Sequence, residues 1–283
     1  MNKIIKKEQL AEKIKRIEVI SPIISKKAKP GQFVVLRVDE KGERIPLTIA
    51  DVNKEKETIT LIFQEIGTTT AKLGLLENGE NILDIVGPLG KPTEIEKYGS
   101  VCIIVGGVGA AFIFWMAKAF KEKENYLITI IGARNKNLII LEEELKNISD
   151  EIYITTDDGS KGRKGFNTEM LVDLIQHGKK IDYCLTAGPI PMMKKVSEIT
   201  KEHNIKTIAS LNPIMVDGTG MCGCCRVTIG GETKFACVDG PDFDAHLVDF
   251  DELLKRTSLY KEMEKISYEK FMNTCKCTSH QQK

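Results

Sequence analysis

The stretch Val101-Cys-Ile-Ile-Val-Gly-Gly-Val-Gly-Ala-Ala111 passes from an apolar strand pattern through a glycine turn into the start of a helix. Strands that are buried on both faces of a parallel sheet are continuously apolar in this way. Residues 101–120 are almost uncharged and resemble a membrane span in length, but Gly106, Gly107, Gly109 and Lys118 interrupt them. A buried strand followed by a helix is the better interpretation, and we expect no membrane span.

The same alternation of strand and helix patterns continues over residues 99–212. Strand patterns lie at 101–105, 127–131, 152–156, 183–186 and 207–210, and helical patterns lie at 110–121, 138–146, 168–176 and 191–203. Alternation of this kind indicates a parallel sheet with helices on both faces, and ligands of such sheets bind at the carboxyl ends of the strands. We predict a doubly wound α/β domain that binds a nucleotide.

The regions on either side follow other patterns. Residues 1–98 contain short β-rich runs such as 32–38 and 58–63, and only residues 68–76 form a helical pattern, so we expect an antiparallel β-barrel. Residues 213–250 form a cysteine-rich loop domain with a hairpin around Gly230 and Gly231. Residues 251–283 indicate a helix followed by a loose end.

Composition restricts the partners and the compartment. The 283 residues carry 41 basic and 40 acidic side chains, so no overall charge favours nucleic acid or an anionic membrane. The eight cysteines follow no secretory signal, which indicates thiol chemistry in a reducing, cytoplasmic compartment. Cys102 and Cys184 fall in apolar strand patterns, where a buried thiol is the simple interpretation.

The segment Asp217-Gly-Thr-Gly-Met-Cys222-Gly-Cys224-Cys225, followed by Cys237, spaces its ligand-type residues as a plant-type ferredoxin loop does, with Asp217 at the first cysteine position. Structural zinc sites usually combine two close Cys or His pairs, so the spacing favours [2Fe-2S] over zinc. Cys224 is an alternative ligand to Asp217. We favour Asp217, because the adjacent Cys224 and Cys225 do not easily face one cluster.

Three loops follow strand patterns in the parallel domain. The glycine turn at Gly106 suits a pyrophosphate or a merely structural connection, because it lacks the G-x-G-x-x-G spacing of the usual dinucleotide site. The loops 155–160 and 187–193 and the residue Arg134 lie along the same expected rim, where a nicotinamide dinucleotide would bind. Arg134 either binds a ribose phosphate or is simply solvated.

Two runs of the barrel region resemble the halves of a flavin site. Arg44-Ile-Pro-Leu-Thr48 offers a guanidinium for a pyrophosphate and a hydroxyl for the reactive edge of the ring. Gly67-Thr-Thr-Thr70 offers amides and hydroxyls at the start of a short helix. Taken singly, either run is more often an exposed arginine or a helix cap.

The order of these motifs resembles the ferredoxin-reductase-type flavoprotein subunits. The nearest groups are the electron-transfer subunit of dihydroorotate dehydrogenase and, closer still, the small subunit of NADH-dependent reduced ferredoxin:NADP+ oxidoreductase, also described as a sulfide dehydrogenase subunit. The run from Asn212 to Gly223 resembles the latter, because the dihydroorotate group has Cys at the position of Asp217. Cys224 and Phe112 depart from the usual pattern.

The resemblance implies FAD, a [2Fe-2S] cluster, NAD(H) and a larger iron-sulfur flavoprotein subunit, with electron bifurcation involving ferredoxin. It assigns the cluster to Asp217, Cys222, Cys225 and Cys237. No catalytic side chain is expected, and Thr48 is the candidate for a hydrogen bond near the reactive nitrogen of the flavin. The expected cofactor contacts are Arg44, Pro46, Leu47, Thr48, Ile62, Phe63, Gln64, Gly67, Thr68, Thr69, Gly106, Gly107, Gly109, Arg134, Asp157, Gly188, Pro189 and Met192.

Several alternatives remain open at this point. NADP(H) is possible, because Arg134 and Lys136 would tolerate a 2′-phosphate. The complex could instead oxidise dihydroorotate or act as a sulfide dehydrogenase, and a zinc-stabilised binding module is the alternative that is not an enzyme. Cys275 and Cys277 have no assigned role.

Overall fold

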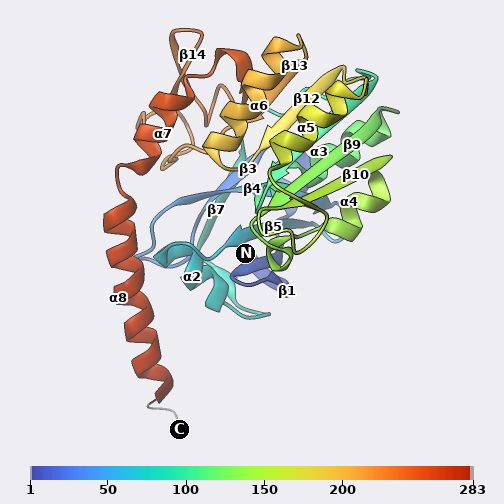
Figure 1. Ribbon diagram of the computed structural model, residues 1–283. Helices are drawn as coiled ribbons and strands as arrows, with labels where there is room; N and C mark the ends of the chain where they lie inside the picture. The colour runs from blue at the N-terminus through green and yellow to red at the C-terminus, as the bar shows by residue number, and fades with distance from the viewer. Residues whose placement is uncertain (1, 281–283) are drawn as a thin grey trace.

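The structure is a computed structural model that describes residues 2–280 of the chain, with side chains up to residue 274. A barrel at the N-terminus and a parallel sheet lie side by side, and the C-terminal segment covers one flank of both (Figure 1). The long C-terminal helix runs beside the barrel, where the hydroxyls of its Ser267 and of Thr68 are 3.0 Å apart, and its end extends past the barrel.

The barrel is a sheet of seven antiparallel strands in the order β6-β1-β2-β5-β4-β3-β7. Its edge strands β6 and β7 are separated in the chain by Leu83 alone, whose N–H donates to the Val38 carbonyl at 3.3 Å. The sheet must therefore curl almost into a closed barrel, as expected. The strands are β1 Asn2–Ala11, β2 Ile14–Ile20, β3 Phe33–Arg37, β4 Ile45–Asn53, β5 Thr58–Gln64, β6 Asn81–Ile82 and β7 Asp84–Leu89.

Two short helices accompany the barrel. Helix α2, Thr68–Leu75, lies where the sequence predicts it. Helix α1, Pro22–Lys27, was not predicted, because its six residues are too few to display a helical period.

The second sheet has the order β11-β10-β9-β8-β12-β13-β16 and confirms the five predicted parallel strands. Strand β11 was missed because it has two residues, and β16 because it comes from the C-terminal segment and pairs antiparallel with β13. The strands are β8 Ser100–Gly106, β9 Tyr126–Ala133, β10 Glu151–Thr156, β11 Arg163–Lys164, β12 Tyr183–Ala187, β13 Lys206–Ser210 and β16 Asp242–Asp244.

Helices cover both faces of this sheet, as predicted. Along β8, Val101 and Ile103 pack on the face covered by α3, Gly109–Glu122, and α4, Glu142–Ile148. Cys102 and Ile104 pack on the opposite face, beneath α5, Asn167–Gln176, and α6, Ile190–Glu202. Cys102 and Cys184 are fully buried free thiols, and no described helix is long and apolar enough to cross a membrane.

The helix predicted at 138–146 is wrong in its first half. A 3-10 turn at Lys136–Leu138 precedes an extended segment, and α4 begins only at Glu142. Ile140 and Leu141 are 3% and 5% exposed, and Leu141 has a φ of 57°, so burial of these two side chains interrupts the helix.

The C-terminal segment contains the predicted hairpin, β14 Arg226–Ile229 and β15 Glu232–Phe235. Gly230 and Gly231, at φ 58° and 82°, supply the left-handed turn that such a hairpin requires. A 3-10 turn, η2 Ala245–Leu247, precedes two helices, α7 Phe250–Ser258 and α8 Lys261–His280, where one helix was expected. The side chains of Cys275 and Cys277 and the expected loose end at 281–283 lie outside the described residues.

The three parts of the chain meet at Thr93, after the last barrel strand. Its hydroxyl donates to Asp242 of β16 at 2.5 Å, and its N–H donates to the Pro30 carbonyl of the barrel at 2.9 Å. A second link joins β4 to α3 through an ion pair of 2.8 Å between Asp51 and Lys118. The barrel, the parallel sheet and the cysteine segment are thus bonded directly to one another.

Candidate functional site

A cavity of about 770 Å³ lies between the barrel and the carboxyl edge of the parallel sheet. The strand order reverses between β8 and β12, and the residues that follow these two strands, Gly107 and Gly188, line the cavity. Crevices at such a switch point are the usual nucleotide sites of open α/β sheets. The expected residues that line it are Gln64, Gly106, Gly107, Arg134, Asp157, Gly188, Pro189 and Met192.

Gly106, Gly107 and Gly109 have different structural roles in the turn. A Cβ on Gly107, which has a φ of +56°, would meet no atom within 4 Å, so this residue faces open space. A Cβ on Gly109 would lie 2.3 Å from the Ala187 carbonyl oxygen, so Gly109 lets α3 pack against β12 and does not line the cavity. A Cβ on Gly106 would lie 2.8 Å from the Met192 sulfur. The turn therefore leaves space for a ligand at Gly107 and packs tightly on both sides of it.

The outer rim of the cavity carries charges of both signs. Arg134 follows β9 and Asp157 follows β10, and both side chains are exposed. Neither has an ion-pair or hydrogen-bond partner for its side chain in the part of the chain that the structure describes, so both are available to a ligand.

Pro191, from the expected 187–193 loop, also lines the cavity. The other lining residues were not predicted from the sequence, namely Ile14, Val108, Phe112, Gly132, Ala133, Leu138, Phe166, Asn167, Thr168, Lys195 and Asn212. Phe166 is 60% exposed just before α5, and Lys195 lies one turn into α6. No local motif marks such residues, because only the packing of α5 and α6 brings them to the rim. Asn167 is fixed by donating to the Val105 carbonyl at 2.9 Å.

The residues expected to bind the flavin do not line this cavity, except Gln64. Arg44, Pro46, Leu47 and Thr48 lie at the start of β4, and Gly67, Thr68 and Thr69 lie at the start of α2. Thr69 donates to Glu43 at 3.4 Å, which brings the start of α2 beside Arg44 as the two-part site requires. Thr48 is half-buried and pairs with Phe33 across the barrel sheet.

Ile62 and Phe63 are each only 2% exposed and belong to the apolar cores. Their side chains therefore do not reach a ligand in the cavity, and a flavin could contact them only through the backbone. Gln64, the next residue, is the point at which β5 reaches the cavity.

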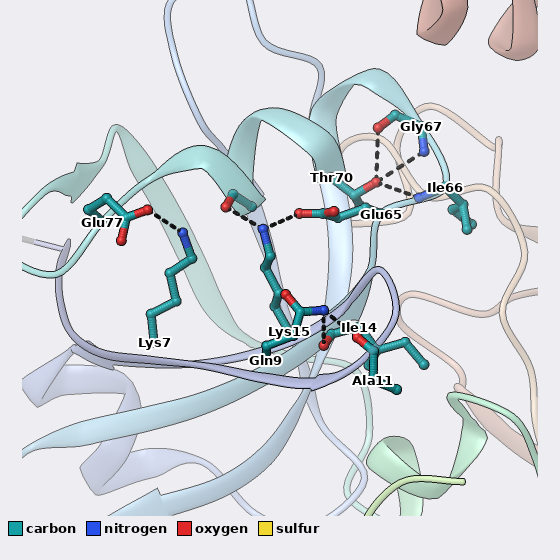
Figure 2. A network of polar contacts seen from close by, with 11 residues as sticks. Lys7, Gln9, Ala11, Ile14, Lys15, Glu65, Ile66, Gly67, Thr70 and Glu77 are labelled. Carbon is teal, nitrogen blue, oxygen red and sulfur yellow. Dashed lines mark hydrogen bonds and ion pairs between the residues drawn. The ribbon is translucent and has the colours of Figure 1, made fainter. Parts of the chain in front are cut away.

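Helix α2 is held at both ends by side chains (Figure 2). At its start the Thr70 hydroxyl accepts hydrogen bonds from the N–H groups of Ile66 and Gly67, both at 3.1 Å. At its end Lys15 of β2 donates to the Gly74 carbonyl at 2.7 Å and pairs with Glu65 at 2.6 Å. This ion pair is largely buried, with side-chain exposures of 16% and 17%. The start of α2, where Gly67, Thr68 and Thr69 are expected to contact the flavin, is thus fixed in place.

The cysteine loop presents two pairs of ligand-type side chains. The Sγ atoms of Cys225 and Cys237 are 3.2 Å apart, and both residues are 1% exposed. The amide and the thiol of Cys222 both donate to the carboxylate of Asp217. No three His, Cys, Asp or Glu side chains of the described chain gather around one point. Two pairs suit a centre of two irons, in which each iron takes two protein ligands.

Hydrogen bonding within the loop favours the anionic forms of Asp217 and Cys222. The amides of Thr219, Cys222 and Met221 lower the pKa of Asp217 to about 2, against the opposing effect of partial burial. The amide of Cys224 lowers the pKa of the Cys222 thiol, whereas burial raises the pKa of Cys237 to about 12. The Gly220 amide also bonds to Cys237. Backbone amides directed at carboxylate and sulfur are what a loop that holds an iron-sulfur cluster supplies, so these residues fit the cluster.

Cys224 lies beside this set. Its thiol contacts that of Cys222, while Cys225 turns inward to Cys237. The adjacent Cys224 and Cys225 thus point to different places, as the sequence argument required. Cys224 faces a small cavity together with Arg256.

A flavin barrel joined to a nucleotide-binding parallel sheet, with a ferredoxin-like cysteine loop after it, defines a ferredoxin-reductase-type oxidoreductase subunit. Comparison with known proteins narrows this class. The family pattern described as the iron-sulfur cluster binding domain of dihydroorotate dehydrogenase B matches residues 212–249. The chain belongs to the family of dihydroorotate dehydrogenase B electron transfer subunits and their homologues.

Two relatives and one solved structure illustrate the similarity. The dihydroorotate dehydrogenase B electron transfer subunit homolog of Thermotoga maritima is 50% identical over 274 residues, 97% of this chain and 96% of its own length. The electron transfer subunit of Clostridium perfringens is 30% identical over 248 residues, 86% of this chain and 98% of its own. A chain of the NADH-dependent reduced ferredoxin-NADP oxidoreductase, studied for flavin-based electron bifurcation, is 50% identical with a TM-score of 0.91, covering 96% of this chain and 98% of that one.

Proposed function

We propose that this chain is the electron-transfer flavoprotein subunit of an electron-bifurcating, NADH-dependent ferredoxin:NADP+ oxidoreductase. It passes electrons between NAD(H), FAD, a [2Fe-2S] cluster and a larger flavoprotein subunit. The observation that carries this proposal is the similarity, at 50% identity and a TM-score of 0.91 over nearly the whole chain, to a chain of that enzyme.

The chain's own residues supply positions rather than acid-base chemistry. Arg44 and the start of α2 would hold the flavin pyrophosphate, and Thr48 would bond near the reactive edge of its ring. When bound, FAD supplies the conversion between the two-electron chemistry of a nicotinamide and the one-electron chemistry of a [2Fe-2S] cluster. The cavity beside Gly107 would hold the nicotinamide nucleotide against the barrel.

The cluster would be held by Asp217 and Cys222 on its exposed side and by Cys225 and Cys237 on its buried side. Cys222 of the first pair is exposed and both residues of the second pair are buried, so the site would be open to solvent or a partner on the side of the first pair. We favour Asp217 over Cys224 as the fourth ligand, because three amides already stabilise its anionic form.

We propose NAD(H) as the nucleotide. The carboxylate of Asp157 lies on the same rim of the cavity as Arg134, beside it on the neighbouring strand, where it can accept bonds from a ribose diol but would repel a 2′-phosphate. The basic residues Arg134 and Lys136 would instead attract a 2′-phosphate. The preference for NAD(H) over NADP(H) therefore depends on the balance between these charges.

The partner would be a larger flavoprotein subunit with clusters of its own, and ferredoxin would react through that complex. Six described cysteines are free thiols, which agrees with a reducing cytoplasm. The apolar side chains Met221 and Leu259, 88% and 68% exposed, lie near the cluster loop, where such a partner would approach.

Purification under anaerobic conditions tests the proposal. We expect bound FAD, iron and acid-labile sulfide in the isolated chain, and copurification of a larger iron-sulfur flavoprotein from the native source. Reconstitution with that subunit should couple the joint oxidation of NADH and reduced ferredoxin to the reduction of NADP+. In the bifurcating direction it should couple NADPH oxidation to the reduction of both NAD+ and ferredoxin. A complex that catalyses neither of these coupled reactions would contradict the proposal.

The second candidate is the electron-transfer subunit of a dihydroorotate dehydrogenase. The names of the T. maritima and C. perfringens relatives favour it. Dihydroorotate-dependent reduction of NAD+ by the native complex would select this function. A zinc module with an empty barrel would contain neither flavin nor sulfide, and the match of residues 212–249 to an iron-sulfur domain argues against it.

A further inference from the structure

A second, smaller cavity of about 170 Å³ adjoins the exposed side of the cluster loop. Cys222, Cys224 and Arg226 line it from the loop, and Arg256 and Tyr260 line it from the end of α7 and the turn that follows. The end of α7 therefore lies directly against the part of the loop that carries Cys222.

The position of α7 is well fixed. Its first residues are capped by Asp249, which accepts from the N–H of Glu252 at 2.8 Å. Phe250 and Leu253, 5% and 1% exposed, pack in the same apolar cluster as Cys225 and Cys237. Arg256 follows Leu253 by three residues and so lies on the same side of the helix. Its guanidinium donates to the Cys224 carbonyl at 3.1 Å.

The charge of Arg256 is not neutralised by a neighbour. Residues 212–249 contain six acidic side chains and two basic ones, Arg226 and Lys234. Lys234 is paired with Glu232 at 2.7 Å. In the described part of the chain, neither Arg226 nor Arg256 has a carboxylate oxygen within ion-pair distance. Arg256, a residue of α7, thus places an unpaired positive charge beside this acidic loop.

We propose that Arg256 is a positioning residue that sets the reduction potential of the [2Fe-2S] cluster. This inference rests on the proposed function, because it requires the cluster in the 217–237 loop. Reduction adds one negative charge to the cluster, and a nearby unpaired guanidinium stabilises the reduced form more than the oxidised form. The bond to the Cys224 carbonyl fixes the turn between Cys222 and Cys225, so the charge is held at a constant position.

Arg256 also lies beyond residue 249, where the match to the iron-sulfur domain ends. The C. perfringens relative is matched over 98% of its length by 86% of this chain. The T. maritima relative is matched by 97% of this chain. The cluster domain of this chain is thus supplemented by a helix that the family pattern does not include.

The test is an anaerobic redox titration of the flavin- and cluster-loaded protein, followed by the electron paramagnetic resonance signal of the reduced cluster. Arg256→Gln keeps a hydrogen-bond donor and removes the charge, and we expect a midpoint potential more negative than that of the wild type. Arg256→Lys keeps the charge and should stay close to the wild type. Lys255→Gln is the matched control, because it removes the same charge from an exposed neighbour that does not contact the loop.

A potential for Arg256→Gln equal to that of Lys255→Gln overturns the inference, and so does a shift of Arg256→Lys as large as that of Arg256→Gln. If the Gln variant holds no cluster, the Lys variant decides: a cluster at the wild-type potential supports the inference, and loss of the cluster overturns it. A wild-type protein without iron and sulfide contradicts the proposed function itself, which is a separate result.

Discussion

Cys222 and Cys224 lie two positions apart in one loop, yet we predict different roles for them. Cys222 bonds to Asp217, whereas Cys224 faces the small cavity beside Arg256. We expect Cys222→Ser to lose most of the iron and acid-labile sulfide and Cys224→Ser to retain them. Each variant should keep its flavin, because the barrel is unchanged, and flavin content therefore serves as the control for folding. Loss of the cluster in Cys224→Ser as well would assign Cys224, in place of Asp217, as the fourth ligand.

Asp157 is predicted to influence the choice between NADH and NADPH. Its carboxylate lies on the cavity rim without a hydrogen-bond partner among the described residues, whereas that of Asp158 accepts from the Ser160 N–H at 2.9 Å. Asp157→Asn should raise the ratio of kcat/KM for NADPH over NADH by about tenfold, or about 1.4 kcal/mol, because a repulsive charge is removed. Flavin-dependent ferricyanide reduction measures this ratio.

Asp158→Asn is the matched control for this substitution, since it makes the same change one residue further along, outside the lining of the cavity. Its nucleotide preference should remain that of the wild type. Equal ratios in the two variants would show that Asp157 does not face the 2′ position of the ribose.

Gly74, near the end of helix α2, lies against the ion pair that holds this helix in place. A Cβ on Gly74 would lie 1.7 Å from Glu65 Oε1, so Gly74→Ala must displace the carboxylate that Lys15 binds (Figure 2). We expect a loss of about 1–3 kcal/mol in stability, because a largely buried ion pair is disturbed. We also expect weaker retention of FAD, because the start of α2 carries Gly67 and Thr69.

Thermal unfolding and the FAD content after dialysis measure these two effects. Leu75→Ala is the control, because Leu75 is the next residue of the helix and is 59% exposed. A Gly74→Ala protein that unfolds like the control and keeps its flavin would show that the Lys15–Glu65 pair does not position α2.

Much of the arrangement of elements was predictable from the sequence, for reasons that differ between regions. The five parallel strands are continuously apolar, so β8 and its neighbours could be predicted from Val101 to Ser210. Strand β16 and the late start of the helix predicted at 138–146 were not predictable. Both depend on tertiary packing, of Asp242–Asp244 against β13 and of Leu141 in the core.

Some residues of the candidate site could likewise be predicted from the sequence, and others could not. Glycine turns and cysteine spacing mark Gly107 and the 217–237 loop, because backbone conformation and ligand number restrict the sequence there. Phe166 and Lys195 could not be found, since an aromatic before a helix and a lysine within one are common on any surface. Only the folded helices bring them to the cavity rim.

At the scale of the whole molecule, the junction of the three parts depends on the buried carboxyl of Asp242, which accepts from Thr93. Burial raises the pKa of Asp242, and the hydroxyls of Thr93 and Ser210 offset part of that effect. The folded state therefore holds the proton more tightly than the unfolded state. This contribution to stability is complete below the ordinary pKa of 3.8 and is lost as the pH rises through the raised native value.

Asp242→Asn removes this titration and keeps an acceptor for Thr93. The variant should gain thermal stability relative to the wild type as the pH is raised from acidic to neutral, and the two should differ least at the acidic end. Unfolding temperatures measured across that range test the expectation. Parallel pH profiles of the two proteins would contradict it.

The proposed function requires one path for electrons from the nicotinamide through the flavin to a two-iron centre within a single chain. An anaerobic titration of the purified protein with NADH, followed by flavin absorbance and electron paramagnetic resonance together, tests this requirement most directly. We predict that NADH bleaches the bound flavin and that chemical reduction then reveals the signal of one reduced [2Fe-2S] cluster per chain. A protein whose flavin does not respond to NADH, or that contains no iron and acid-labile sulfide, would contradict the account.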